Sequence, residues 1–153
     1  MAATIEIRRF AGAEDLARIE RLVSAVVREC YGHLLQDYRF DAGENWPAAW
    51  IAETGGDLAG VLLTGHAWLD DLWIAHPYRR RGIGARLLEI AEGEIAGRGH
   101  PRAHLRVVAE NLPARQFYAR HGWREDRGYS HEAQGFAMIE MSKALQPGAG
   151  PKS

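Results

Sequence analysis

Residues 68–91 read WLDDLWIAHPYRRRGIGARLLEIA, a stretch that combines strand, loop and helix signals. Its first part, from about Trp68 to Ile74, is rich in aromatic and apolar residues and predicts a strand. Apolar residues then recur at helical spacing and predict a helix that ends near Arg98-Gly99. Between the two lies a short loop with three arginines and two glycines. A strand, a basic glycine loop and a helix therefore follow one another directly.

The loop Arg79-Arg80-Arg81-Gly82-Ile83-Gly84 suits an anionic phosphate. Successive backbone N–H groups and the positive end of the helix dipole can hold such a group, and arginines add bidentate donors. Two common phosphate motifs do not match. A Walker loop requires a Gly-Lys-Ser/Thr ending, and the dinucleotide fingerprint requires a third glycine where this chain has Leu87. Taken alone, the hexapeptide could still be an ordinary helix start with exposed arginines.

Upstream of this stretch, the hydrophobic pattern predicts a helix and an antiparallel hairpin. The compact glycine turn Thr54-Gly55-Gly56-Asp57 separates two extended runs, which is typical of a hairpin. The residues from Tyr31 to Trp46 have no clean period, and we expect an irregular second helix and a loop there. The other elements expected before residue 68 are a short start around Ile5 and Ile7, a helix from Glu14 to Glu29, and the hairpin runs Ala49 to Glu53 and Leu58 to Leu63.

Downstream, the pattern predicts a parallel crossover and a mixed sheet. The run from His104 to Ala109 predicts the next strand, so a strand–helix–strand unit with parallel pairing is expected. Pro113 opens a short helix, and Gly122 ends it. Two closing strands are expected, one from Trp123 onward and one from Phe136 to Met141.

Composition bounds the class of protein. A chain of 153 residues with 46% apolar residues suits one domain, expected over residues 1–145, and the Pro- and Gly-rich tail over residues 146–153 is expected to be disordered. No run approaches the ~18 apolar residues that span a bilayer, so no membrane insertion is expected. The formal net charge of −1 gives no global field for nucleic acid. The single cysteine, Cys30, gives no sign of an oxidising compartment, and we expect a cytoplasmic protein.

A family resemblance rests on two motifs in order. The loop Arg79 to Gly84, after the triplet Leu72-Trp73-Ile74, resembles the acyl-CoA signature Arg/Gln-x-x-Gly-x-Gly/Ala of the GNAT N-acetyltransferases. The second GNAT motif follows at the expected distance as NLPARQFYARHGW, residues 111–123. The resemblance is strong from about Leu58 to Trp123 and rests on element order elsewhere. It implies the GNAT fold, an α/β architecture in which helices flank a mixed, mostly antiparallel sheet with a parallel strand–helix–strand core that binds acetyl-CoA.

The resemblance also implies a cofactor site. The backbone of Leu72, Trp73 and Ile74 should bond the pantetheine arm of acetyl-CoA as a neighbouring strand would, and Asn111 with Pro113 should line the far side of that arm. Trp73 could equally be only a core aromatic. The residues expected around the pyrophosphate are Arg79, Arg80, Arg81, Gly82, Ile83, Gly84 and Ala85.

Acetyl transfer from a thioester needs a neutral amine, a stabilised oxyanion and a proton for the departing thiolate. By the resemblance, Tyr118 belongs to the cofactor site and protonates the coenzyme A sulfur, and the Ile74 N–H stabilises the oxyanion. Alternatively, Tyr118 is only a packed helix aromatic. Asp70 and Asp71 lie beside the expected thioester, but alternate strand residues face opposite sides. We expect Asp70 to be the base, directly after desolvation or through a water. Alternatively, both carboxylates only orient a cationic substrate or cap a loop.

The resemblance implies that the acceptor is an amine of a small molecule or a peptide. The strand around Asp70 and Asp71 is locally similar to that of the spermidine/spermine N-acetyltransferases, which have an acidic pair there. By the resemblance, the acceptor pocket should come from the early helices and the last strands. Pairing through the closing strands is common in the family, so a homodimer is one assembly that the resemblance allows. The histidines lack metal-ligand spacing, so no metal is expected. The acceptor candidates are Tyr31, Asp37, Tyr38, Trp46, Tyr129 and His131.

Two other functional classes compete with an acetyltransferase. A non-catalytic acyl-CoA-sensing domain would keep the cofactor loop, but the intact Tyr118 beside Asn111 argues against it. Nucleic-acid binding through the arginine cluster would depend steeply on salt. The balanced charge of the remaining chain argues against that function.

Overall fold

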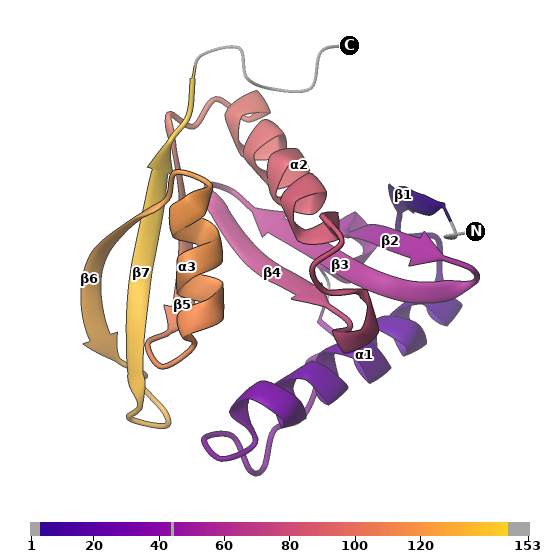
Figure 1. Ribbon diagram of the computed structural model, residues 1–153, viewed down its shortest axis with the longest axis horizontal. Helices are drawn as coiled ribbons and strands as arrows, with labels where there is room; N and C mark the ends of the chain where they lie inside the picture. Colours follow the sequence, from indigo (N-terminus) through magenta and orange to yellow (C-terminus); the bar gives the residue numbers. More distant parts are fainter. Residues whose placement is uncertain (1–3, 44, 147–153) are drawn as a thin grey trace. The chain divides into compact units, whose positions relative to one another are not determined.

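The computed structural model describes residues 4–43 and 45–146. Within these residues the chain forms seven strands, three α-helices and two short 3-10 helices (Figure 1). The predicted strand over 68–74 is confirmed to the residue, and the expected parallel crossover follows it. In chain order the elements are β1 (Ile5–Arg9), α1 (Ala13–Tyr31), η1 (Trp46–Ala48), β2 (Trp50–Thr54), β3 (Asp57–Gly65), β4 (Trp68–Ile74), η2 (His76–Tyr78), α2 (Ile83–Gly97), β5 (Arg102–Val108), α3 (Leu112–Arg120), β6 (Arg124–Ser130) and β7 (Ala137–Ala144).

The chain divides into two compact units. Unit 1 comprises Met1–Thr64 and Asp71–Ala91, and unit 2 comprises Gly65–Asp70 and Glu92–Ser153. Strand β4 and helix α2 therefore contribute residues to both units. The strand order is β1-β2-β3-β4 on the unit 1 side and β4-β5-β7-β6 on the unit 2 side.

The strands of unit 1 are antiparallel. Strand β2 pairs with β1 and with β3, and the Ala75 N–H donates to the Ala59 carbonyl at 2.8 Å where β4 ends beside β3. The β2–β3 turn is made by Gly55 and Gly56, with φ of 57° and 85°. Two successive positive φ values suit a tight hairpin turn and favour glycine. The predicted hairpin is therefore confirmed.

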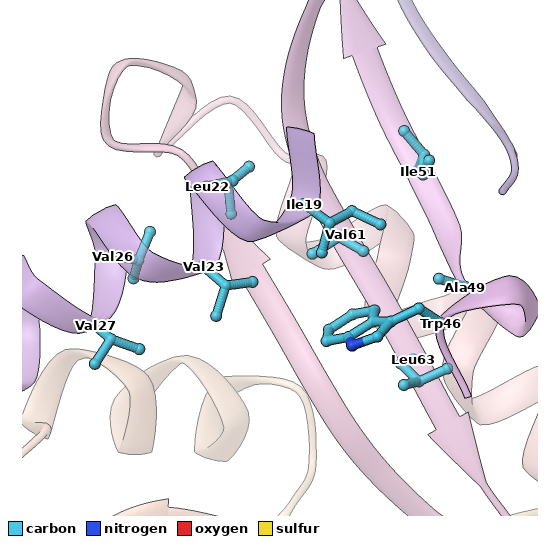
Figure 2. Packing of buried hydrophobic residues seen from close by; sticks show 10 residues of the cluster. All are labelled: Ile19, Leu22, Val23, Val26, Val27, Trp46, Ala49, Ile51, Val61 and Leu63. Carbon is cyan, nitrogen blue, oxygen red and sulfur yellow. The ribbon is translucent and has the colours of Figure 1, made fainter. Parts of the chain in front are cut away.

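Helix α1 supplies the core of unit 1. Its apolar stripe is buried against residues of β2 and β3 and against Trp46 (Figure 2). Burying each large side chain contributes about 1.5–3 kcal/mol, so the stripe explains why this helix forms as predicted, two residues longer at its C-terminal end. The labelled members are Ile19, Leu22, Val23, Val26, Val27, Trp46, Ala49, Ile51, Val61 and Leu63.

The first turns of α2 cover the opposite face of the unit 1 strands (Figure 1). A Cβ at Gly60 of β3 would lie 2.8 Å from Ile74 Cδ1 and 3.2 Å from Leu87 Cδ1. Glycine at this position therefore lets the end of β4 and helix α2 approach the strand closely.

The irregular helix expected between Tyr31 and Trp46 is wrong for the described residues of that segment. Tyr31 is the last residue of α1, and its carbonyl accepts from the Leu34 and Leu35 amides at 2.9 and 2.8 Å in a closing turn. Further along, in a stretch without helix or strand, the Gly43 N–H donates to Asp41 Oδ1 at 2.9 Å. Local hydrogen bonds of this kind, between a side chain and a nearby backbone N–H, compete with helix formation.

Unit 2 contains the predicted crossover and closing strands. Strand β5 pairs in parallel with the start of β4, at Trp68 and His104, and antiparallel with β7, which pairs in turn with β6. The side chain of Asn111 caps α3 by accepting from the Ala114 N–H at 3.2 Å. Residues 147–153 of the expected disordered tail lie outside the described residues.

An ion-pair network of two arginines and two carboxylates joins β1, α1 and β2. Asp15, 4% exposed, accepts from Arg8 Nη1 and Nη2, each at 2.8 Å, and from the Ala11 N–H at 2.7 Å. Glu53 accepts from Arg8 Nε and Arg18 Nη1, each at 2.7 Å. Hydrogen bonds from the arginines hold the pKa of Asp15 and of Glu53 below the ordinary values.

Asp15→Asn should lower the free energy of unfolding by about 1–3 kcal/mol at pH 7. The neutral Asn side chain has one oxygen and cannot accept charge-assisted hydrogen bonds from both Nη1 and Nη2 of Arg8. The folded pKa of Asp15 lies below its ordinary value of 3.8. Its contribution is therefore present above about pH 4 and lost as pH falls through the folded pKa. Urea unfolding across the acid range should show a shallower loss in the variant, and Glu14→Gln, an exposed carboxylate of the same turn, is the control. Parallel curves for Asp15→Asn and wild type would contradict this role.

Candidate active site

The loop before α2 forms a cradle of backbone amides. The first bond of α2 runs from the Arg86 N–H to the Gly82 carbonyl at 3.1 Å, and the amides of Ile83, Gly84 and Ala85 precede it, without an acceptor inside the helix. Gly82 has a φ of 80°, and a Cβ there would meet nothing within 4 Å. The open space and the positive helix end fit a phosphate group.

The three arginines of the loop differ in their surroundings. The Arg79 guanidinium bonds to Glu29 of α1 and to the Ile74 carbonyl. Arg81 lies over the Tyr78 ring, 5.6 Å from its centroid. Among the described residues, neither Arg80 nor Arg81 has an ion pair. The positive charges of these two side chains are therefore not neutralised by a carboxylate of the described residues.

The end of β4 presents backbone groups away from β3. The Ala75 N–H points to β3, where it bonds to Ala59, and backbone groups of successive strand residues point to alternate sides. The N–H and C=O of Ile74 therefore point to the other side of the strand. Leu72, Trp73 and Ile74 are all half-buried.

Trp73 packs as a core aromatic, one of the two roles expected for it. Its side chain lies against the core of unit 1, and its ring meets the Tyr31 ring edge-on, with centroids 6.5 Å apart. The Trp73 indole N–H donates to Asp71 Oδ1 at 2.8 Å. This packing of the side chain leaves the backbone role predicted for Trp73 untouched.

Asp70 and Asp71 lie on opposite faces of β4, as alternation requires. Asp71 shares the face of Trp73, whereas the Asp70 carboxylate lies against Gly65, where an added Cβ would come within 2.8 Å of Oδ2. Although Asp70 as a whole is exposed, desolvation of this carboxylate raises its pKa, against the opposing charges of Arg106, His66 and Arg98 in unit 2. A raised pKa makes an aspartate a stronger base.

Tyr118 is anchored in unit 2. It lies on α3, is 8% exposed, and its ring packs beside those of Phe117 and Trp123, with centroids 5.3 and 5.9 Å apart. Asn111 and Pro113 form the start of the same helix, where the Asn111 side chain is the cap. The predicted cofactor and catalytic residues of this motif therefore share one short helix.

Two of the acceptor candidates lie near Asp71 in unit 1. Tyr31 packs against Trp73, and burial together with the charges of Asp71 and Asp41 raises the pKa of Tyr38. The structure thus groups aromatic rings with carboxylates at the end of α1 and in the segment after it.

The other acceptor candidates have different surroundings. Trp46 is buried in the core and donates its indole N–H to the Asp41 carbonyl at 2.9 Å, and Asp37 is exposed. In unit 2, the Arg127 guanidinium lies 4.9 Å from the Tyr129 ring centroid. His131 stacks on Phe136, and its Nδ1 accepts from the Gln134 N–H at 3.1 Å in the β6–β7 turn.

Metal and membrane sites do not emerge from the described residues. These residues contain no group of three or more His, Cys, Asp or Glu side chains that could hold a metal ion. Within the same residues, no helix has the length and apolar character needed to cross a bilayer.

Solved structures with the same fold include the following three. Ard1 from Thermoplasma volcanium is 16% identical with a TM-score of 0.75, over 93% of this chain and 98% of that chain. The NatC complex bound to Gag peptide and CoA is 19% identical with a TM-score of 0.70, over 93% and 99%. Nourseothricin acetyltransferase is 23% identical with a TM-score of 0.60, over 65% of each chain. At these identities the likeness shows the fold alone.

The sequence itself shows the family. No curated protein gives a significant sequence match. The model of the acetyltransferase (GNAT) family matches residues 16–123, which include most of α1, the phosphate cradle and the whole second motif. This match spans well over half of the chain, and the protein therefore belongs to the GNAT family of acetyltransferases, which use acetyl-CoA as acyl donor.

Proposed function

We propose that this acetyltransferase acetylates a primary amine of a small molecule or peptide by direct attack in a ternary complex. The observation that carries the proposal is the cradle of amides at the start of α2, directly after a strand end whose Ile74 backbone groups point away from β3. Family membership favours this enzyme over the non-catalytic sensing domain. A lone, half-buried Cys30, whose pKa burial raises, is not needed as a nucleophile.

The backbone is the main holder of acetyl-CoA in this proposal. The amides from Arg80 to Ala85 would hold the pyrophosphate, the strand end from Leu72 to Ile74 would bond the pantetheine arm, and Asn111 with Pro113 would line it. Bound acetyl-CoA supplies an activated thioester. The Ile74 N–H would stabilise negative charge on the carbonyl oxygen.

Two side chains would move protons. Asp70 would accept a proton from the attacking amine, directly or through a water, and its raised pKa supports this role. The Tyr118 hydroxyl would give a proton to the departing sulfur, since a phenol can act as the general acid toward a thiolate.

In the version of the proposal that we favour, the acceptor is a small cationic amine. Asp71 beside Trp73, with Tyr31 and Tyr38 nearby, combines negative charge with aromatic faces, and both attract ammonium groups. A peptide amine is the alternative acceptor, and Asp37, Tyr129 and His131 remain acceptor candidates.

Assembly and location complete the proposal. Strand β6 ends the strand order on the unit 2 side, and an edge strand offers unpaired backbone groups to a second copy. We therefore propose a homodimer that pairs through the closing strands β6 and β7. We also propose that the protein is cytoplasmic.

Release of free coenzyme A from acetyl-CoA should depend on one class of amine. A thiol reagent can follow the release across polyamines, amino acids, aminoglycosides and short peptides. We expect release with small cationic amines and background rates with the others. Release with peptides alone would replace the small-molecule acceptor by a peptide. No release with any amine, while acetyl-CoA still raised the unfolding temperature, would contradict the proposed acceptor classes.

Tyr118→Phe should lower kcat about 100-fold while leaving coenzyme A affinity nearly unchanged, because only the proton donor is removed. Steady-state kinetics and calorimetric titration with coenzyme A measure the two quantities. Tyr78→Phe is the matched control, since it removes the phenol that bonds Asp57 at 2.8 Å in unit 1. Equal kcat in wild type and Tyr118→Phe would rule out Tyr118 as the acid.

Asp70→Asn should lower kcat/KM about 100-fold, as expected for loss of a general base. In the wild type the base form of Asp70 is populated as pH rises through its raised pKa, above the ordinary 3.8. The rising limb of kcat/KM against pH should therefore include this ionisation, and the variant should lack it. Asp71→Asn is the matched comparison and should mainly raise KM for the amine. The opposite pattern would make Asp71 the base.

A further inference from the structure

Arg79, the first residue of the phosphate loop, is bound on three sides within unit 1. Its Nη1 and Nη2 donate to Glu29 Oε2 and Oε1, each at 2.9 Å. Its Nε donates to the Ile74 carbonyl at 3.2 Å. A bidentate arginine–carboxylate pair is geometrically specific as well as charge-assisted. The guanidinium is therefore directed at the last turns of α1 and at the end of β4.

Glu29 also contacts His76, just before the loop. Its Oε2 also lies 2.9 Å from His76 Nδ1, so one carboxylate bonds the residues on both sides of Pro77 and Tyr78. Hydrogen bonding from Arg79, the largest effect, holds the pKa of Glu29 below its ordinary value. Glu29 is therefore ionised at neutral pH and keeps both partners.

The bond from Arg79 acts on the peptide group between Ile74 and Ala75. The oxygen of this planar group accepts from Arg79, and its N–H donates to Ala59. Because a peptide is rigid, two bonds on opposite sides fix its orientation. The carbonyl belongs to Ile74, the residue whose N–H is the proposed oxyanion donor.

We propose that Glu29 is a positioning residue for acetyl-CoA binding, acting through Arg79, and that Arg79 is a brace of the loop rather than a phosphate ligand. Glu29 holds the Arg79 guanidinium on the Ile74 carbonyl. This contact fixes the positions of the end of β4 and of the first residue of the loop before acetyl-CoA binds. The phosphate charge is then met by the backbone amides and by Arg80 and Arg81. This inference rests on the proposed function, because it assigns roles within the same cofactor site.

The two roles of Arg79 predict opposite effects of removing the Glu29 charge. If Arg79 braces the loop, Glu29→Gln loosens the preorganised site and weakens coenzyme A binding. If Arg79 binds phosphate, Glu29→Gln frees its guanidinium from a competing carboxylate and strengthens binding. The direction of one affinity change therefore separates the two roles.

Calorimetric titration with coenzyme A should give about two- to tenfold weaker binding for Glu29→Gln, as expected from lost preorganisation around a partly exposed ion pair. KM for acetyl-CoA should rise in parallel, while kcat at saturating acetyl-CoA changes less than about threefold. Glu20→Gln is the matched control, because Glu20 is an exposed carboxylate of the same helix. Unfolding temperatures without ligand check that each variant is folded.

Arg79→Gln and the double variant complete the test. If the pair acts as one brace, the double variant should bind coenzyme A no more weakly than Arg79→Gln alone. Tighter binding by Glu29→Gln, or affinity equal to that of Glu20→Gln, would overturn the positioning role while leaving the proposed function intact. Failure of the wild type to bind coenzyme A would instead overturn the proposed function.

Discussion

The peptide group between Ile74 and Ala75 is the constraint on which the site depends. It is bonded through its N–H to β3 and through its oxygen to Arg79. A strand must stop pairing and turn before a helix can present its first amides to a ligand. Holding the last peptide of β4 on both sides fixes where that turn begins. Eight residues later, α2 starts at Ile83, so the strand end and the helix end are placed by the same short segment.

Packing on two faces keeps this segment in place. On one face, Trp73 packs against Tyr31 and the α1 core. On the other, the side chains of Ile74 and Leu87 fill the space that a Cβ at Gly60 would need. Functional groups held by packed elements keep their geometry better than groups on loops. The ion pair between Glu29 and Arg79 then adds a polar interaction to this apolar packing on both faces of β4.

Local signals explain what the sequence predicts well. The hairpin turn has two adjacent glycines, β4 is dense in aromatic and apolar residues, and α1 has a regular stripe, so these elements agree with prediction. The expected helix after Tyr31 does not form, because apolar residues of this segment, such as Leu35 and Phe40, instead pack against the core of unit 1. Glu29 and Arg79 are 50 residues apart in the chain, so no local sequence pattern predicts their ion pair.

The acidic pair shows why a motif must be resolved into single residues. Asp70 and Asp71 are adjacent in sequence, yet the pleat of β4 sends them to opposite faces. Asp71 is tied to the Trp73 indole among aromatic rings, whereas the Asp70 carboxylate lies against Gly65 with its pKa raised by desolvation. Two carboxylates on opposite faces of a strand cannot share a proton. The pair therefore provides two separate chemical environments, one suited to taking a proton and one suited to attracting a cation.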